Sequence, residues 1–377
     1  MQPLTTIALD RGERQEAFWT LVDREVGRMA GGLIEAVLGE QQRLALQADW
    51  HERTAGRCGR RNGYYRRRLT SPYGVLSLRV PRLRRGGVDC SLVFERYRRR
   101  CRDVDRVLRR VFLAGVSTRD AAGLAEQLWG GPVSHQTISR LARWLDERLA
   151  AYRRQPIASV YPVVQIDGMY VTVEGTKQVV MLAVGLRERG PPEVLGFRLS
   201  RGEGCAELLW DLRRRGLEGV GLFVSDDSGA VEAAIREVYP EVPWQSCTWH
   251  RLVNLWTVIG PKDYRRRMVR EAARIFRCVS LDAAQETARA WARRWQAYEP
   301  PIVRWFLARL PDSLTFYHLP TRWWRRTRTT SLTERLIRTL RMRLRLMGAF
   351  AHPAAAERAV FGQLLRWHLV PEITHRT

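Results

Sequence analysis

The sequence predicts an α/β protein in which a basic, mainly helical N-terminal region precedes an α/β domain with a helical insertion. Three observations give this prediction. Apolar residues recur with the helical period through residues 12–48, and two shorter helical patterns lie within 104–150. From residue 159, short apolar runs rich in β-branched residues are typical of strands. Residues 262–325 then return to a helical pattern.

The charge of the chain indicates a polyanionic partner. Its 377 residues include 64 Lys+Arg against 39 Asp+Glu, a formal net charge of +25. Such an excess most often serves nucleic-acid binding. Only Lys177 and Lys262 are lysines. A GC-rich genome accounts for much of this arginine bias, yet planar guanidinium groups also suit phosphate and guanine. Charge selects the partner and leaves both an enzyme and a structural nucleic-acid-binding protein open.

Cysteine usage and hydropathy indicate a soluble, cytoplasmic bacterial protein without a membrane partner. The six cysteines are scattered and form no regular framework, which favours a reducing compartment. The N-terminus lacks the apolar stretch of a signal peptide. No segment approaches the roughly 20 apolar residues of a membrane span.

A basic segment, residues 51–103, follows an N-terminal helical region, residues 1–50. The stretches RNGYYRRRL and VLSLRV flank a turn signal at Ser71–Gly74, which predicts a small β-hairpin lined with arginines. A solvated charged loop is the alternative. Because tyrosines alternate with the arginines, we expect DNA contacts from this segment. The expected contact residues are Arg66, Arg67 and Arg68.

Residues 104–155 have the pattern of a helix-turn-helix. GVSTRDAAGLAEQLWG predicts a helix capped by Ser117 or Thr118, GGPV a short turn, and SHQTISRLARWLDERL a second helix capped by Ser134. An ordinary helical hairpin has the same spacing. If the unit binds DNA, base edges would be read from the exposed start of the second helix. The residues placed there are His135, Gln136, Thr137 and Arg140.

The remaining segments have the strand-and-helix order of a ribonuclease-H-like domain. SVYPVVQI, YVTVE, QVVMLAVGL and EVLGFRL are expected as strands, and CAELLWDLRRRGL as a helix. The strand VGLFVS, a helix, a short strand near Trp244–Cys247 and another helix follow. Hairpin-linked strands and then βα alternation define that order. We assign 156–260 to the first part of this core, 261–327 to the helical insertion and 328–377 to the C-terminal helices.

Three acidic residues stand at the ends of these elements. Asp167 closes the first strand, Asp226 closes the strand after the first long helix, and Glu334 begins the last arginine-rich helix. Sites in open α/β sheets form at the carboxyl ends of strands, so the two aspartates would share a crevice if their strands are neighbours. Carboxylates that converge within a positive protein can hold divalent cations against a polyanion.

Each acid also has a purely structural interpretation. Asp167-Gly168 has the composition of a β-turn, and Asp226 or Asp227 could cap the following helix. Ser331-Leu-Thr-Glu334 fits a capping box. The functional interpretation depends on the joint occurrence of the three acids.

From about residue 55 to residue 350, the chain resembles the Mutator-type (MULE-like) transposases of bacterial insertion sequences, which have a DDE catalytic domain. The stretches that carry the resemblance are RNGYYRRRL, GVLSLRVPRLRRG, GVSTRDAAGLAEQL with SHQTISR, VVQIDGMYVTV, VLGFRLSRGEGCAELLWDLRRRGLEGVGLFVSDDSGAVEAAIREVYPEVPWQSCTWHRLVNL and RTRTTSLTERLIRTLRMRLRLMGAF.

The resemblance implies catalytic and metal-binding roles for Asp167, Asp226 and Glu334, which would hold two Mg²⁺ ions, with Mn²⁺ as a substitute. It further implies binding of double-stranded DNA at inverted repeats and at the target, strand cleavage, and strand transfer by the freed 3′-OH. The protein would act on DNA as a homo-oligomer. Arg338 and Arg341, one and two turns past Glu334, would hold phosphates.

Two positions depart from the family pattern: Asp227 stands where the family usually has Gly, and Ser331 where it often has Asn. Neither indicates an inactive copy. The resemblance also draws attention to Cys247-x-x-His250. Because a structural zinc site needs four ligands, we expect this pair to place DNA or brace the active site.

Two rival functions remain open: a domesticated, non-catalytic DNA-binding regulator, and a ribonuclease-H-like nuclease without strand transfer. The tryptophans of the insertion also allow two interpretations. Trp291, Trp295 and Trp324 would pack a local helical core, or one of them would stack on an unpaired base beside the cut.

Overall fold

The computed structural model describes residues 11–95, 98–202 and 204–370. The chain divides into two compact units between Ala142 and Arg143. Each unit has its own core, and each is described by itself below.

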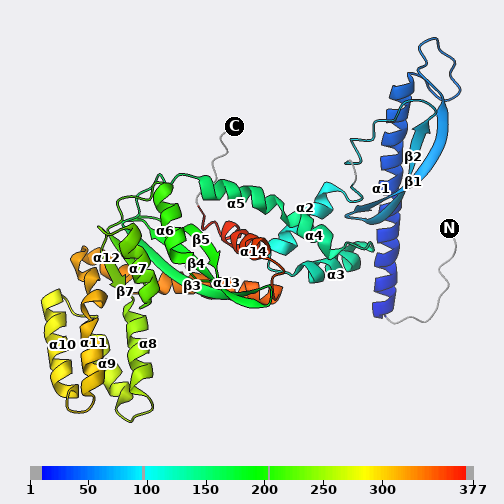
Figure 1. The fold of residues 1–377 in the computed structure, drawn as a ribbon. Coiled ribbons are helices and arrows are strands. Elements are labelled where there is room, and N and C mark those ends of the chain that lie inside the picture. Colours follow the sequence, from blue (N-terminus) through cyan, green and yellow to red (C-terminus); the bar gives the residue numbers. More distant parts are fainter. Residues whose placement is uncertain (1–10, 96–97, 203, 371–377) are drawn as a thin grey trace. The chain divides into compact units, whose positions relative to one another are not determined.

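A long helix lying on a β-hairpin forms the beginning of the first unit (Figure 1). Helix α1 covers Arg11–Leu46, and the antiparallel hairpin joins β1 (Arg61–Ser71) to β2 (Gly74–Leu83). The helix passes through its glycines unbroken, and Gly27 permits the close approach: a Cβ there would lie 3.2 Å from the Tyr73 carbonyl oxygen. The predicted helix and hairpin are confirmed. The buried residues between them are Leu38, Leu69, Leu76, Leu78, Val80 and Phe94.

Three short helices complete the first unit: α2 (Arg102–Leu113), α3 (Thr118–Trp129) and α4 (His135–Ala142). The Ser117 hydroxyl accepts a hydrogen bond from the Asp120 N–H, and the Ser134 hydroxyl accepts one from the Thr137 N–H. Both predicted N-caps are therefore formed. The second predicted helix is interrupted at Arg143, because its continuation, α5 (Trp144–Arg154), buries its apolar side chains in the second unit.

A five-stranded mixed sheet forms the centre of the second unit. Its strand order is β5-β4-β3-β6-β7, in which β3, β4 and β5 are antiparallel neighbours and β6 and β7 run parallel to β3. This arrangement confirms the predicted α/β class. The strands are β3 (Val163–Val173), β4 (Thr176–Leu186), β5 (Glu193–Ser200), β6 (Leu222–Ser225) and β7 (Trp244–Ser246).

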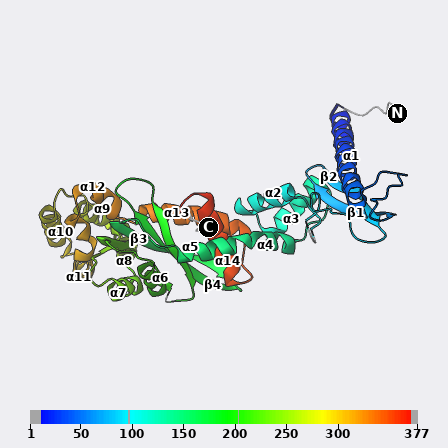
Figure 2. The ribbon, with the colours of Figure 1, turned by 90° about the horizontal axis from the view of Figure 1, so that it is seen from above.

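Helices cover both faces of this sheet (Figures 1 and 2). On one side, α6 (Gly204–Arg214) and α7 (Gly229–Val238) bury the main apolar core against the strands. On the other side lie α13 (Ser331–Met347) and α14 (Pro353–Arg366). A two-bond ion pair from Arg358 to Asp146 ties α14 to α5.

The chain between β7 and α13, which contains the predicted insertion 261–327, is helical, and α8 to α11 pack together there (Figure 1). Trp291 and Trp295 are each only 3% exposed, and the Trp324 indole donates to the Leu319 carbonyl. All three therefore pack local structure, as the core interpretation predicts. The elements are α8 (Thr248–Ile259), α9 (Arg265–Ile275), α10 (Leu281–Trp295), α11 (Pro300–Ala308), the 3-10 turns Pro311–Ser313 and Thr315–His318, and α12 (Thr321–Thr327).

One strand prediction was wrong. Asp167 does not close a strand, because β3 continues through it to Val173 and pairs with β4 along its whole length. The glycine at 168 serves packing, not a turn: a Cβ there would lie 2.8 Å from the Met181 sulfur. A side chain at 168 would thus crowd Met181 and Val179 of the paired strand β4, and its neighbour Asp167 lies in mid-strand.

The described residues contain no helix long and apolar enough to cross a membrane. The six cysteines are all free thiols, as expected from their scattered positions.

Candidate active site

Two of the predicted acids lie at matching positions in the register of two neighbouring parallel strands. The parallel pairing of β3 with β6 ends at Gln165 and Val224. Asp167 and Asp226 each follow two residues later, so both lie just past the point where the paired strands part. The strand pattern thus brings them to one edge of the sheet, as the sequence predicts.

Gln165 fixes the third acid to the same strand. Its fully buried side chain donates to the Arg326 and Thr329 carbonyls at 2.8 and 3.0 Å. Its carbonyl oxygen accepts from the Thr333 hydroxyl at 2.8 Å. These bonds hold the start of α13 against β3. Glu334, in the first turn of α13, consequently lies close enough to Asp167 for its charge to act on that carboxyl.

His250 and Cys247 lie between β7 and the start of α13. The His250 Nε2 is 3.5 Å from a Glu334 carboxylate oxygen. The Cys247 sulfur is fully buried and accepts 3.4 Å hydrogen bonds from the Thr330 N–H and hydroxyl. The Thr330 hydroxyl also lies 3.2 Å from Glu334. Both residues therefore contact the segment that carries Glu334.

Burial dominates the electrostatics of the acids. It raises the pKa of Asp167 to about 6, and the nearby charges of Asp226 and Glu334 act in the same direction. The pKa of Asp226 is also raised, again chiefly by burial. His250 partly offsets both effects. Its own pKa is raised to about 9, chiefly by its interaction with Cys247 and further by the carboxylates. The site thus holds more negative charge than its own cation balances.

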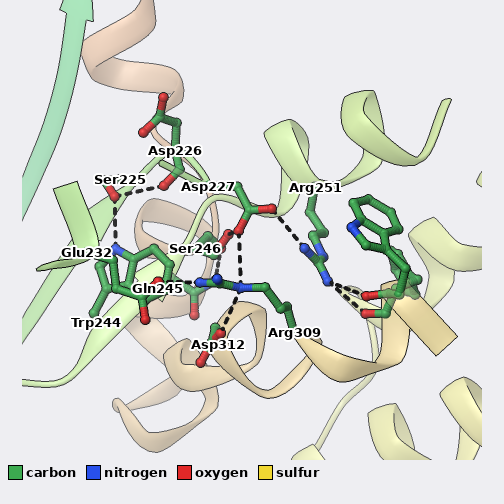
Figure 3. Close-up of polar contacts among 12 residues, drawn as sticks. Ser225, Asp226, Asp227, Glu232, Trp244, Gln245, Ser246, Arg251, Arg309 and Asp312 are labelled. Atoms are coloured by element: carbon green, nitrogen blue, oxygen red, sulfur yellow. Dashed lines mark hydrogen bonds and ion pairs between the residues drawn. The ribbon is translucent and has the colours of Figure 1, made fainter. Parts of the chain in front are cut away.

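Asp227 has a different environment from Asp226 (Figure 3). One Asp227 oxygen accepts a 2.8 Å hydrogen bond from Arg251, whose side chain is fully buried. Arg309 lies 3.8 Å from the other oxygen, and Ser246 donates to it at 3.3 Å. Figure 3 shows the Asp226 carboxylate pointing away from this network. Asp227 is thus engaged in packing, whereas the Asp226 carboxylate stays available.

The donor set suits divalent metal ions bound through oxygen. Two half-buried carboxylates with raised pKa values gain from a cation, and Mg²⁺ prefers carboxylate oxygens. In the described part of the chain, the three candidate ligand atoms within 4.8 Å of one another are those of Cys247, His250 and Glu334. Asp167, Asp226 and Glu334 do not form such a close group among the described residues.

The sequence-predicted arginines of the hairpin do not share one face. Arg66 and Arg68 are exposed, as alternation along β1 requires. Arg67 points to the covered face, where its guanidinium lies 4.0 Å from the centre of the Phe94 ring and donates to the Arg98 carbonyl. The DNA contacts predicted for the three arginines stay a prediction, and Arg66 and Arg68 are the two that the fold leaves exposed.

On α4, His135, Gln136 and Arg140 are exposed. Thr137 is 7% exposed, and its hydroxyl lies 3.1 Å from that of Ser134. Its side chain supports the helix cap and does not belong to the exposed set. In the second unit, Arg338 and Arg341 are exposed on the flank of α13 that carries Glu334.

The sequence did not single out two residues that hold the site together, or an exposed tryptophan next to His250. Gln165 is a polar residue within an apolar strand, and that mismatch was a usable signal. Arg251 follows His250 directly but gave no signal of its burial. Trp249, also next to His250, is 55% exposed in the first turn of α8. Its exposure depends on the fold and could not be derived from its sequence neighbours.

Comparison with known proteins identifies the class. Residues 7–368 match the family described as "Transposase, Mutator family". The chain belongs to this family. It is 32% identical over 343 residues to the transposase for insertion sequence element ISRM5 of Rhizobium meliloti (strain 1021), covering 89% of this chain and 86% of that relative.

Two further relatives are similarly close. The transposase for insertion sequence element IS406 of Burkholderia multivorans (strain ATCC 17616 / 249) is 31% identical and is covered to 88%, as is this chain. The transposase for IS256 in transposon Tn4001 of Staphylococcus aureus is 31% identical, covering 88% of this chain and 87% of the relative. The relatives support a transposase function for this chain.

Proposed function

We propose that the protein binds the ends of an insertion sequence and catalyses metal-dependent DNA strand cleavage and strand transfer. Asp167, Asp226 and Glu334 are the proposed catalytic residues and metal ligands. One observation carries this proposal: two half-buried aspartates lie just past the end of the same parallel strand pairing, and Gln165 ties the helix of the glutamate to that strand pair.

We further propose that the second unit has a ribonuclease-H-like core. The sheet order β5-β4-β3-β6-β7, with three antiparallel strands followed by two parallel ones, supports it. In the first unit, α3 and α4 would act as a helix-turn-helix that reads base edges through His135, Gln136 and Arg140. The exposed Arg66 and Arg68 would bind phosphates. The protein would act as a homo-oligomer on double-stranded DNA.

The chain's own residues have distinct tasks in this reaction. Asp167, Asp226 and Glu334 would hold two Mg²⁺ ions, which supply activation of the attacking oxygen and stabilisation of the leaving oxygen. Gln165 and Cys247 keep the glutamate helix in place. Arg338 and Arg341, on the Glu334 flank of α13, would hold DNA phosphates beside the site.

Strand cleavage by charge-neutral variants tests the proposal. Asp167→Asn, Asp226→Asn and Glu334→Gln each remove a negative ligand at constant size. Each should lower cleavage of a duplex element end by about a thousandfold or more while binding stays within about twofold, since several kcal/mol of transition-state stabilisation depend on the metals. A wild-type protein that binds but never cuts would instead be a regulator. One that cuts but cannot join pre-cleaved ends would be a nuclease.

A further inference from the structure

A basic cavity lies beside the candidate active site in the second unit. Its volume is about 340 Å³, within the range of small ligand sites. Its walls are the part of β3 near Val171, the last turns of α13, and Phe350. The pairing of β3 with β6 ends at Gln165. Beyond Gln165, no described strand pairs with this side of β3 until the bridge between Val173 and Phe350. The cavity therefore lies along the same strand edge as Asp167.

Three cations converge on this cavity: Lys177, Arg341 and Arg345. In a chain with a formal charge of +25, unpaired arginines alone mean little. Here, however, no acidic side chain lines the cavity, and none of the three makes an ion pair with any residue that the structure describes. Arg358 on the neighbouring α14, by contrast, is held by a carboxylate. Convergent cations without internal acids suit an external anion.

The spacing of the cavity from the acids follows from helix geometry. Arg341 and Arg345 follow Glu334 by seven and eleven residues, which keeps them on its flank of α13. At 1.5 Å per residue, they lie about 10 and 16 Å along the helix from Glu334. A duplex strand advances about 3.4 Å per nucleotide, so this span corresponds to roughly three to five nucleotides.

We propose that this cavity binds phosphodiester groups of the cleaved DNA strand, three to five nucleotides from the scissile phosphate. The inference rests on the proposed function and adds a specific strand register to it. Lys177 and Arg345 become binding residues that the sequence did not indicate. Tyr170, which is 67% exposed at the rim, borders the same path.

Salt dependence of duplex binding gives the first test. Each lost phosphate contact lowers the slope of log K against log salt by about 0.9, so Arg341→Ala with Arg345→Ala should lower it by about 1.8. Arg343→Ala is the matched control, because Arg343 is exposed on the opposite flank of the same helix. Arg345→Lys should keep the wild-type slope, since it keeps the charge. Melting temperatures confirm that each variant is folded. A fall of about 0.9 for Arg343→Ala, the value of one lost phosphate contact, overturns the localisation.

Neutral methylphosphonates, placed one at a time on either strand of a duplex that the wild-type protein cuts, give the second test. Three to five nucleotides from the scissile phosphate on the cleaved strand, a methylphosphonate should weaken duplex binding by the wild-type protein. It should cause no further loss of affinity in the variant that carries both Arg341→Ala and Arg345→Ala. On the other strand, or about ten nucleotides away, the two losses should add. Additive losses everywhere, with normal wild-type cleavage, overturn this inference alone. A wild-type protein that binds no duplex overturns the proposed function as well.

Discussion

Asp226→Asn and Asp227→Asn should have opposite effects on stability and catalysis, although the residues are adjacent. Asp227 neutralises Arg251, whose side chain is 0% exposed and lies 2.8 Å away. Removing one partner of a buried ion pair costs about 3–5 kcal/mol, because the other charge stays buried without compensation. For a unit of this size, 1 kcal/mol shifts the melting temperature by roughly 2–4 °C. Asp227→Asn should therefore lower it by roughly 6–20 °C.

Asp226 gives the reverse expectation. Burial raises the pKa of Asp226, so its ionised form is disfavoured in the folded protein. At neutral pH and without divalent ions, Asp226→Asn should leave the melting temperature unchanged or raise it, while abolishing cleavage. Asp227→Asn should cut DNA at a near-normal rate per folded molecule when assayed well below its melting temperature.

Thermal melting in a chelating buffer and a single-turnover cleavage assay with Mg²⁺ measure both effects on the same preparations. Asp227→Leu with Arg251→Met, which removes the pair together, is the control and should recover much of the lost stability. The reasoning is refuted if Asp226→Asn lowers the melting temperature as much as Asp227→Asn does. It is also refuted if fully folded Asp227→Asn is inactive, because the catalytic assignment is then off by one residue.

Three further predictions concern neighbouring residues. Gln165→Leu leaves the Arg326 and Thr329 carbonyls without their partner, at a cost of about 1–3 kcal/mol each, and frees the helix of Glu334. The Mg²⁺ concentration for half-maximal cleavage should therefore rise while DNA affinity stays the same. An unchanged Mg²⁺ requirement contradicts this role. Asp167 has a pKa of about 6 in the folded protein against an ordinary 3.8, so without metal its contribution to stability falls as pH rises between these values. The difference in melting temperature between Asp167→Asn and wild type, in favour of the variant, should therefore grow from pH 4 to pH 7. A constant difference argues against the raised pKa. The exposed Trp249 is the tryptophan beside His250 that is free to stack on an unpaired base, so Trp249→Ala should keep the melting temperature but lose cleavage on duplex ends, with rescue when the flanking bases are unpaired. The buried Trp295 should instead lose stability when changed to Ala, and the opposite pattern would make Trp295 the stacking residue.

The sequence by itself determined the family, the order of the elements and the positions of Asp226 and Glu334. These depend on local signals: an apolar run followed by an acid, and the helical period after Ser331. The caps at Ser117 and Ser134 were equally local, because a cap involves residues only a few positions apart. Such signals need no knowledge of what packs against them.

Only the tertiary structure decided which polar residues are available. Asp226 and Asp227 are adjacent acids, and only the burial of Arg251 against Phe306 shows that Asp227 is the one engaged in an ion pair. Arg67 differs from its neighbours because strand alternation turns it toward Phe94. Gln165 acts on Thr333, which is 168 residues further along the chain. Side-chain burial and partner choice arise from contacts between distant segments, and those contacts exist only once the sheet and its helices have packed.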